Sequence, residues 1–141
     1  MKILEILTKK RRIGNIGEDI AAKELKKTGY KILERNYVAV DSEIDIIAEN
    51  KDTIAFVEVK TRSVGYNNPR EPRPASAVTK EKQRKIITAA KYYIGGRDNE
   101  KHLSLDVIEV YLNEDGTKNK VLHIKNAFNR NTAYERKAYT K

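Results

Sequence analysis

The sequence predicts an α/β domain in which a central sheet of about five strands is flanked by helices. Five segments have the alternating or continuously apolar pattern of β-strands, at residues 30–38, 43–49, 54–61, 102–112 and 120–128. Two other segments repeat apolar residues at helical spacing, at residues 16–28 and 79–94. With 141 residues, of which 39% are hydrophobic, the chain is long enough to bury the core of one domain.

The composition favours a polyanionic partner such as nucleic acid. The 29 Lys and Arg residues outnumber the 20 Asp and Glu residues, which gives a net charge of +9. The sequence contains no cysteine, which excludes disulfides and a thiolate zinc site. No apolar run approaches the roughly 20 residues needed to span a bilayer. We expect a soluble cytoplasmic protein with no membrane partner, divided into a basic N-terminal segment (1–12), one domain (13–128) and a basic tail (129–141).

The first predicted helix runs from about residue 16 to residue 28. Ile16, Ile20 and Leu25 fall on one helical face, and Gly29 supplies a stop. Glu18 lies in the first turn of this helix. An acid there either complements the helix dipole or belongs to a functional site.

The strand at residues 54–61 is unusual because Glu58 and Lys60 lie inside an otherwise apolar run. Burying an unpaired charge costs roughly several kcal/mol. The pattern therefore makes sense only if other charges, a metal ion or an open cleft meet these two side chains.

Turn-forming residues at 50–52 predict that strand 43–49 folds back antiparallel onto strand 54–61. A two-residue loop would place Asp45 opposite Phe56 and diagonal to Glu58, and a four-residue loop would place Asp45 directly opposite Glu58. Both registers put the two acids on one face. A three-residue loop without a bulge would separate them.

Basic residues follow this strand. Residues 63–75 contain three prolines and are predicted to be a loop, and Thr79 is placed to cap the second helix. Cations in the first turns of that helix oppose its dipole, so we expect either that an anion binds nearby or that Glu81 and other acids offset them. The candidate nucleic-acid contacts are Arg62, Arg70, Arg73, Lys80, Lys82 and Arg84. A merely solvated basic surface is the alternative.

Carboxylates that converge repel one another unless a hard cation lies between them. Mg²⁺ or Mn²⁺ suits Asp45, Glu58 and Glu18, with the backbone carbonyl of Val59 as a further oxygen. Lys60 could then orient a water or stabilise a developing anion. These are the components of metal-assisted phosphodiester hydrolysis. The alternative is an ordinary cross-strand ion pair on the sheet surface.

Four segments resemble the PD-(D/E)XK nuclease superfamily and its YraN-like bacterial branch. They are Gly-Glu-Asp-Ile-Ala (17–21), Glu-Ile-Asp-Ile-Ile (43–47), Phe-Val-Glu-Val-Lys-Thr-Arg (56–62) and Lys-Gln (82–83). The resemblance covers residues 13–128 and extends to archaeal Holliday-junction resolvases. It implies a restriction-endonuclease-like three-layer sandwich with a central mixed sheet. The implied Mg²⁺-dependent centre comprises Glu18, Asp45, Glu58 and Lys60, with Gln83 as a supporting residue.

The sequence departs from the pattern of that superfamily at three places. Ile44 stands where the superfamily has the proline that names its motif, Ser42 where the branch usually has Gly, and Ser104-Leu105 where it often has Arg-Phe. None of these departures removes a catalytic group.

The first functional hypothesis is a metal-dependent endonuclease that hydrolyses DNA phosphodiester bonds. Branched or single-stranded DNA is the candidate substrate, and a homodimer is the candidate assembly. The second hypothesis is a nucleic-acid-binding module that retains the nuclease fold without useful turnover. The third is a protein-interaction domain whose basic face meets an acidic partner.

Overall fold

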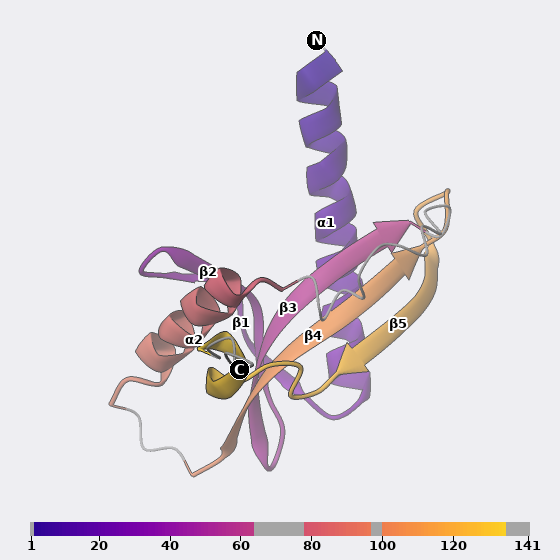
Figure 1. The fold of residues 1–141 in the computed structure, drawn as a ribbon. Coiled ribbons are helices and arrows are strands. Elements are labelled where there is room, and N and C mark those ends of the chain that lie inside the picture. The colour runs from indigo at the N-terminus through magenta and orange to yellow at the C-terminus, as the bar shows by residue number, and fades with distance from the viewer. Residues whose placement is uncertain (1, 64–77, 97–99, 135–141) are drawn as a thin grey trace, which may run out of the picture.

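The computed structural model describes residues 2–63, 78–96 and 100–134. It has a central sheet with helices on both faces (Figure 1). The helices are α1 (Lys2–Lys27), α2 (Lys80–Ile94) and α3 (Arg130–Ala133), and the strands are β1 (Lys31–Ala39), β2 (Ser42–Glu49), β3 (Thr53–Ser63), β4 (His102–Leu112) and β5 (Lys118–Ile124). None of the helices within these ranges is both long enough and apolar enough to cross a membrane.

The sheet is mixed and has the strand order β1-β2-β3-β4-β5. Strands β3 and β4 are parallel, and the other neighbouring pairs are antiparallel. Helix α2 connects the two parallel strands, as the crossover of a parallel pair requires. The three layers confirm the predicted fold class and agree with a restriction-endonuclease-like fold.

Two apolar clusters fill the spaces between the layers. Phe56 packs with Ile86 and other residues on the α2 side, and Val57 packs with Leu25 on the α1 side. Every residue from Ile54 to Glu58 is buried. The apolar run predicted at residues 54–61 is therefore covered on both faces as far as Glu58, which lies at the margin of a packed core.

The β2–β3 hairpin has the register of the four-residue loop. The last pair is Glu49 with Ile54, and the pairing extends back to Ile46 with Val57. The Asn50 side chain accepts hydrogen bonds from the backbone N–H groups of Asp52, at 3.0 Å, and Thr53, at 2.8 Å. The next position along the two strands after Ile46 and Val57 places Asp45 opposite Glu58.

Helix α1 begins at Lys2, well before the predicted start at about residue 16. Lysine, leucine and arginine favour helix, and Gly14 and Gly17 each cost only about 1 kcal/mol in a helix interior. The first half of the helix extends away from the sheet (Figure 1). The predicted segment boundary at residue 12 thus falls within a continuous helix.

The C-terminal region also differs from the prediction. Strand β5 ends at Ile124, and the buried Phe128 lies beyond it. The predicted tail contains the short helix α3, which Asn129 caps through its side chain. This helix contacts α2, so the polar sequence after residue 128 is in part a packed element.

Candidate active site

Asp45 and Glu58, here called the acidic pair, occupy facing positions of the β2–β3 hairpin. The Oδ2 atom of Asp45 accepts a hydrogen bond from the Val59 backbone N–H at 2.8 Å, which turns this carboxylate towards β3. Glu58 is 8% exposed. Two carboxylates are therefore held close together at the edge of the core.

The environment opposes ionisation of Asp45. Burial raises the pKa of Asp45 from 3.8 to about 7, and the charges of Glu58, Glu18 and Glu43 act in the same direction. The hydrogen bond from Val59 acts in the opposite direction and lowers this pKa. A divalent cation between the two carboxylates would stabilise their charged forms and so offset the effect of burial and of the neighbouring acids.

Two lysines approach the acidic pair from different elements. The Nζ atom of Lys60 lies 3.5 Å from Glu58 Oε1, and the Nζ atom of Lys82 lies 4.0 Å from the same oxygen. Lys82 lies in the first turn of α2, where Thr79 caps the helix by accepting its backbone N–H. Glu58 is therefore one of the acids that offset the basic start of α2, and Glu81, which pairs with Lys85 at 3.7 Å, is another.

Glu18 lies near this site but has its own partners. Its Oε2 atom is 3.6 Å from Arg35 Nη2, and Arg35 also pairs with Asp19 at 2.8 Å. Burial raises the pKa of Glu18, and the charge of Arg35 opposes that change. In the described ranges no three His, Asp or Glu side chains are arranged to hold a metal ion. Glu18 is therefore adjacent to the acidic pair without completing a three-carboxylate cage.

The donors that are present still suit Mg²⁺ or Mn²⁺. Magnesium is commonly bound by one or two carboxylates, with waters and substrate phosphates completing its coordination. Asp45 and Glu58 supply those carboxylates, and their mutual repulsion favours a cation between them. The Val59 carbonyl remains a candidate third oxygen. The residues therefore fit a hard divalent cation.

Sequence reasoning missed another buried acid, Glu109, which lies beside Lys60. Glu109 is 3% exposed, occupies the position on β4 paired with Lys60, and accepts a hydrogen bond from the Tyr111 hydroxyl at 2.6 Å. The sequence did contain a signal for this residue: Glu109 is a single acid between two apolar residues, Ile108 and Val110, just as Glu58 lies between Val57 and Val59. Lys60 therefore has acidic residues both on its own strand and on the neighbouring one.

Gln83 and Arg84 connect α2 to the C-terminal region. The Nε2 atom of Gln83 donates to the Val78 carbonyl at 2.9 Å, and its Oε1 atom accepts from the Thr132 hydroxyl at 2.9 Å. The Nε atom of Arg84 donates to the Ala133 carbonyl at 2.8 Å. Gln83 is buried, and these bonds hold the first turns of α2 in place.

The other predicted nucleic-acid contacts that the structure describes lie on separate elements. Arg62 is half-buried near the end of β3, and Lys80 is exposed at the start of α2. Arg70 and Arg73 lie outside the described residues. Of the six candidates, Lys82 lies against the acidic pair.

A second polar cluster lies on the α1 side of the sheet. Asp106 is fully buried and accepts hydrogen bonds from His123 Nε2 at 2.7 Å, from the Asn126 backbone N–H at 3.0 Å and from Ser104 Oγ. The serine therefore bonds the carboxylate directly and does not contact the imidazole as a nucleophile would. This cluster stabilises the β4–β5 pair.

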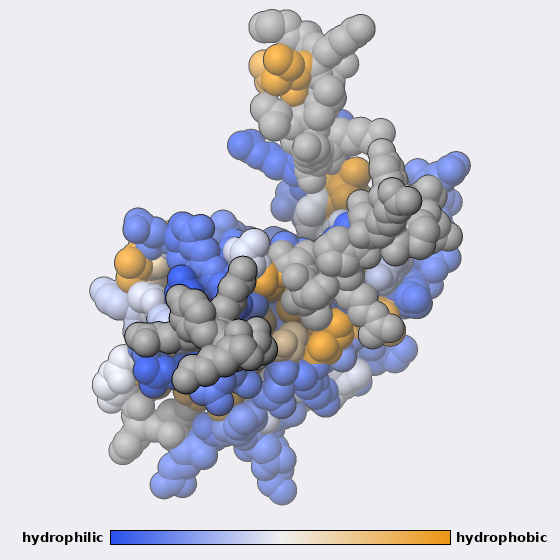
Figure 2. Space-filling model, in the orientation of Figure 1, coloured by the Kyte–Doolittle hydropathy of each residue, from blue (hydrophilic) through white to orange (hydrophobic). Residues whose placement is uncertain are grey.

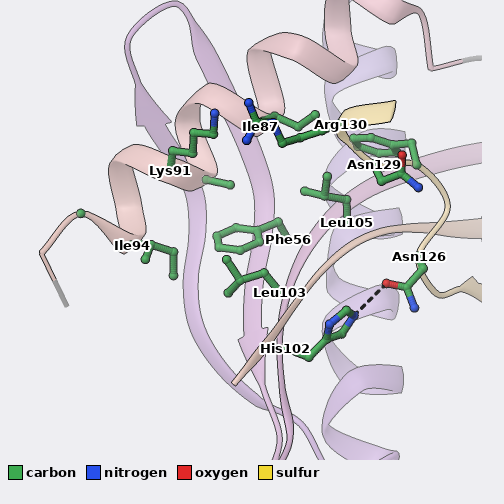
Figure 3. Close-up of a pocket in the computed structure, with 13 residues that line it drawn as sticks. Phe56, Ile87, Lys91, Ile94, His102, Leu103, Leu105, Asn126, Asn129 and Arg130 are labelled. Atoms are coloured by element: carbon green, nitrogen blue, oxygen red, sulfur yellow. Dashed lines mark hydrogen bonds between the residues drawn. The ribbon is translucent and has the colours of Figure 1, made fainter. Parts of the chain in front are cut away.

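A cavity of about 640 Å³ lies between α2 and β4 (Figure 3). Phe56, Leu103 and Leu105 form much of its lining, and Lys91 and Arg130 contribute charged groups. The described residues that line it include no carboxylate. It adjoins the acidic pair only through Phe56, two residues before Glu58, and supplies none of the groups that hydrolysis needs.

Comparison with known proteins identifies relatives along most of the chain. The model of the uncharacterised protein family UPF0102 matches residues 17–110. A UPF0102 protein of Caldanaerobacter subterraneus subsp. tengcongensis is 48% identical over 122 residues, which cover 84% of this chain and 96% of the relative. A UPF0102 protein of Caldicellulosiruptor saccharolyticus is 45% identical over 127 residues, covering 84% and 98% of the two chains. This chain therefore belongs to the UPF0102 family.

Proposed function

We propose that this protein is a metal-dependent nuclease of the PD-(D/E)XK superfamily that hydrolyses DNA phosphodiester bonds. One observation carries the proposal. The buried carboxylate of Glu58 faces the half-buried carboxylate of Asp45 across the β2–β3 hairpin, and Lys60 Nζ lies 3.5 Å from Glu58 Oε1. An ordinary surface ion pair would leave both acids exposed.

Each residue of the site has a distinct role in this proposal. Asp45 and Glu58 hold the cation, and the Val59 N–H fixes the orientation of Asp45. The bound cation supplies charge neutralisation and lowers the pKa of a coordinated water. Lys60 orients the attacking water or stabilises the negative charge that develops on phosphorus oxygens. Lys82 contacts the substrate backbone.

The proposed substrate is DNA, with branched or single-stranded DNA as candidate forms and a homodimer as the candidate assembly. The net charge of +9 supports a nucleic-acid backbone as the partner. Lys82 adds a cation at the acidic pair itself, where a phosphate would approach.

The test is cleavage of labelled single-stranded, duplex, flap and four-way-junction DNA in Mg²⁺, Mn²⁺ or EDTA. Wild type is compared with Glu58→Gln, Lys60→Ala and the control Glu114→Gln, which changes an exposed turn residue. We expect metal-dependent product from wild type and the control, and a loss of roughly 100-fold or more in both site variants. Undiminished product from purified Glu58→Gln would overturn the proposal.

A second candidate function is DNA binding without turnover. The observation that favours it is the pairing of Glu18 with Arg35, which leaves two carboxylates rather than three at the site. The same assay separates the two functions. Salt-sensitive binding to DNA with no product in either metal would favour the binding module.

A further inference from the structure

The turn between β1 and β2, here called the hairpin tip (residues 38–41), carries two exposed apolar side chains. Val38 is 68% exposed and Val40 is 65% exposed, whereas Ala39 between them is buried. Figure 2 shows isolated apolar surface among hydrophilic residues at the left edge, where this turn lies in Figure 1. These two side chains add little to the core of this chain, so their apolar character suits a partner.

The backbone of Val40 is strained. Its φ of 58° lies in the left-handed region, which β-branched residues rarely adopt. Glycine, asparagine or aspartate would relieve a strain of about 1–3 kcal/mol. A residue that costs stability and also exposes an apolar side chain is the kind of outlier found at functional sites.

Asn36 and Tyr37, the two residues before the hairpin tip, contact β2 within the hairpin and the helices α1 and α2 outside it. With its amide oriented to donate to both acids, Asn36 Nδ2 lies 3.2 Å from Glu18 Oε2 and 2.8 Å from Glu43 Oε1. The Tyr37 ring meets the Tyr93 ring edge-on, with centroids 5.2 Å apart. These contacts join the hairpin to α1, β2 and α2, so the tip is held at a fixed position relative to the acidic pair.

The position of the tip suits contact with a DNA strand that reaches the acidic pair. Val38 pairs with Glu43, two residues from Asp45, and Val40 lies just beyond the Ala39–Ser42 pair. At about 3.3 Å per strand residue, the two valines lie about 7–15 Å along the strand from Asp45, or about two to four base steps. Val40 also lines a cavity of about 140 Å³ together with Asp41 of the tip and with Arg84 and Lys85 of α2. Arg84 donates to the Ala133 carbonyl and Lys85 pairs with Glu81, so two cations held by their own contacts lie beside the apolar tip.

We infer that Val38 and Val40 form a wedge that inserts between bases about two to four steps from the bond that is cut. The inference rests on the proposed function. Two valines offer far less than the roughly 800 Å² per partner of a stable protein interface, whereas an intercalating wedge needs only one or two apolar side chains.

The wedge deepens the proposed function by selecting the substrate class. Unstacking a base step in closed duplex costs a few kcal/mol, and less where the bases are already unpaired. The preferred substrate is therefore DNA that is open or branched beside the cleaved strand.

The test measures binding by fluorescence anisotropy in EDTA, with a closed duplex and a splayed-arm DNA of the same sequence. Wild type is compared with a double variant, Val38→Ser with Val40→Asn, and with the control Leu122→Ser. Asparagine tolerates the left-handed backbone, and Leu122 is an exposed apolar residue on the distant strand β5. Thermal unfolding checks that the variants fold.

We expect wild type and the control to prefer the splayed-arm DNA by about fivefold or more, and the double variant to bind both DNAs within about twofold. An equal preference in wild type and the double variant, or no DNA binding at all, would overturn the wedge. Cleavage is scored separately. If the protein cleaves DNA in the presence of metal but the double variant keeps the preference for splayed-arm DNA, the nuclease proposal stands and the wedge is rejected. If the preference depends on the two valines but no DNA is cleaved, the wedge stands and the nuclease proposal is rejected.

Discussion

Gly17 of α1 lies directly against Thr61 of β3. A Cβ atom at Gly17 would stand 2.9 Å from Thr61 Cβ, closer than packed carbon atoms approach. Thr61 directly follows Lys60, so this contact sets how closely α1 covers the strand that carries Glu58 and Lys60. The neighbouring Glu18 owes its place beside the site to the same contact.

Gly17→Ala is expected to destabilise the protein by about 1–3 kcal/mol, because the added methyl group forces α1 away from β3. Gly14→Ala is the matched control, since a Cβ there meets nothing within 4 Å. Alanine at position 14 should stabilise the helix by up to about 1 kcal/mol. Urea unfolding of the two variants checks both signs, and equal effects would contradict the close packing.

Asp45→Asn is expected to increase stability at pH 8 and to change it little at pH 4.5. The pKa of Asp45 is about 7 in the folded protein against 3.8 as the ordinary value, so the folded state binds the proton more tightly. Between these values the free energy of unfolding falls as the pH rises. Asparagine removes this effect and still accepts the Val59 N–H.

The gain at pH 8 should be about 1–3 kcal/mol, since the full pKa difference corresponds to at most about 4 kcal/mol. Urea unfolding in EDTA at the two pH values measures it, and Asp41→Asn, at an exposed position, is the control. A variant that is less stable than wild type at pH 8 would show that the Asp45 charge is favourable without metal.

Mg²⁺ is expected to raise the melting temperature of wild type and not that of Asp45→Asn. A ligand that binds only the folded state at ten times its Kd stabilises by about 1.4 kcal/mol. Differential scanning calorimetry across a Mg²⁺ series measures the effect. A shift of equal size in the variant would place the bound metal elsewhere.

Lys82→Gln is expected to weaken DNA binding and to reduce the salt dependence of that binding. If Lys82 neutralises one phosphate, the slope of log K against log salt should fall by about 0.9. Lys91→Gln, near the other end of α2, is the control. Salt titrations of both variants give the comparison, and unchanged slopes in Lys82→Gln would remove it from the interface.

His123→Ala is expected to destabilise the protein by about 1–3 kcal/mol, because the buried Asp106 loses one of its donors. Leu122→Ser, at the exposed position beside it, should cost less than about 1 kcal/mol. Thermal unfolding ranks the two variants. A similar small loss for both would indicate that Ser104 and Asn126 satisfy Asp106 without the imidazole.

The apolar pattern of the strands predicted the bounds of the sheet more accurately than the apolar face at residues 16–25 predicted the start of α1. The bounds of β4 match the predicted strand, because its apolar run is long and is followed by a clear turn. The predicted start of α1 at about residue 16 was wrong because it rested on the apolar face that begins at Ile16, whereas the helix begins at Lys2. Gly17, inside this helix, packs against Thr61, a contact that is distant in sequence.

The sequence by itself determined the α/β class, the burial of β3 and the presence of charges that need partners within it. Those features are local, since alternation, caps and turn residues act over a few positions. Only the tertiary structure decided the hairpin register, the approach of Lys82 and the pairing of Glu18 with Arg35. These depend on how separate elements pack, and a one-residue slip in the register would have moved Asp45 to the other face of the sheet.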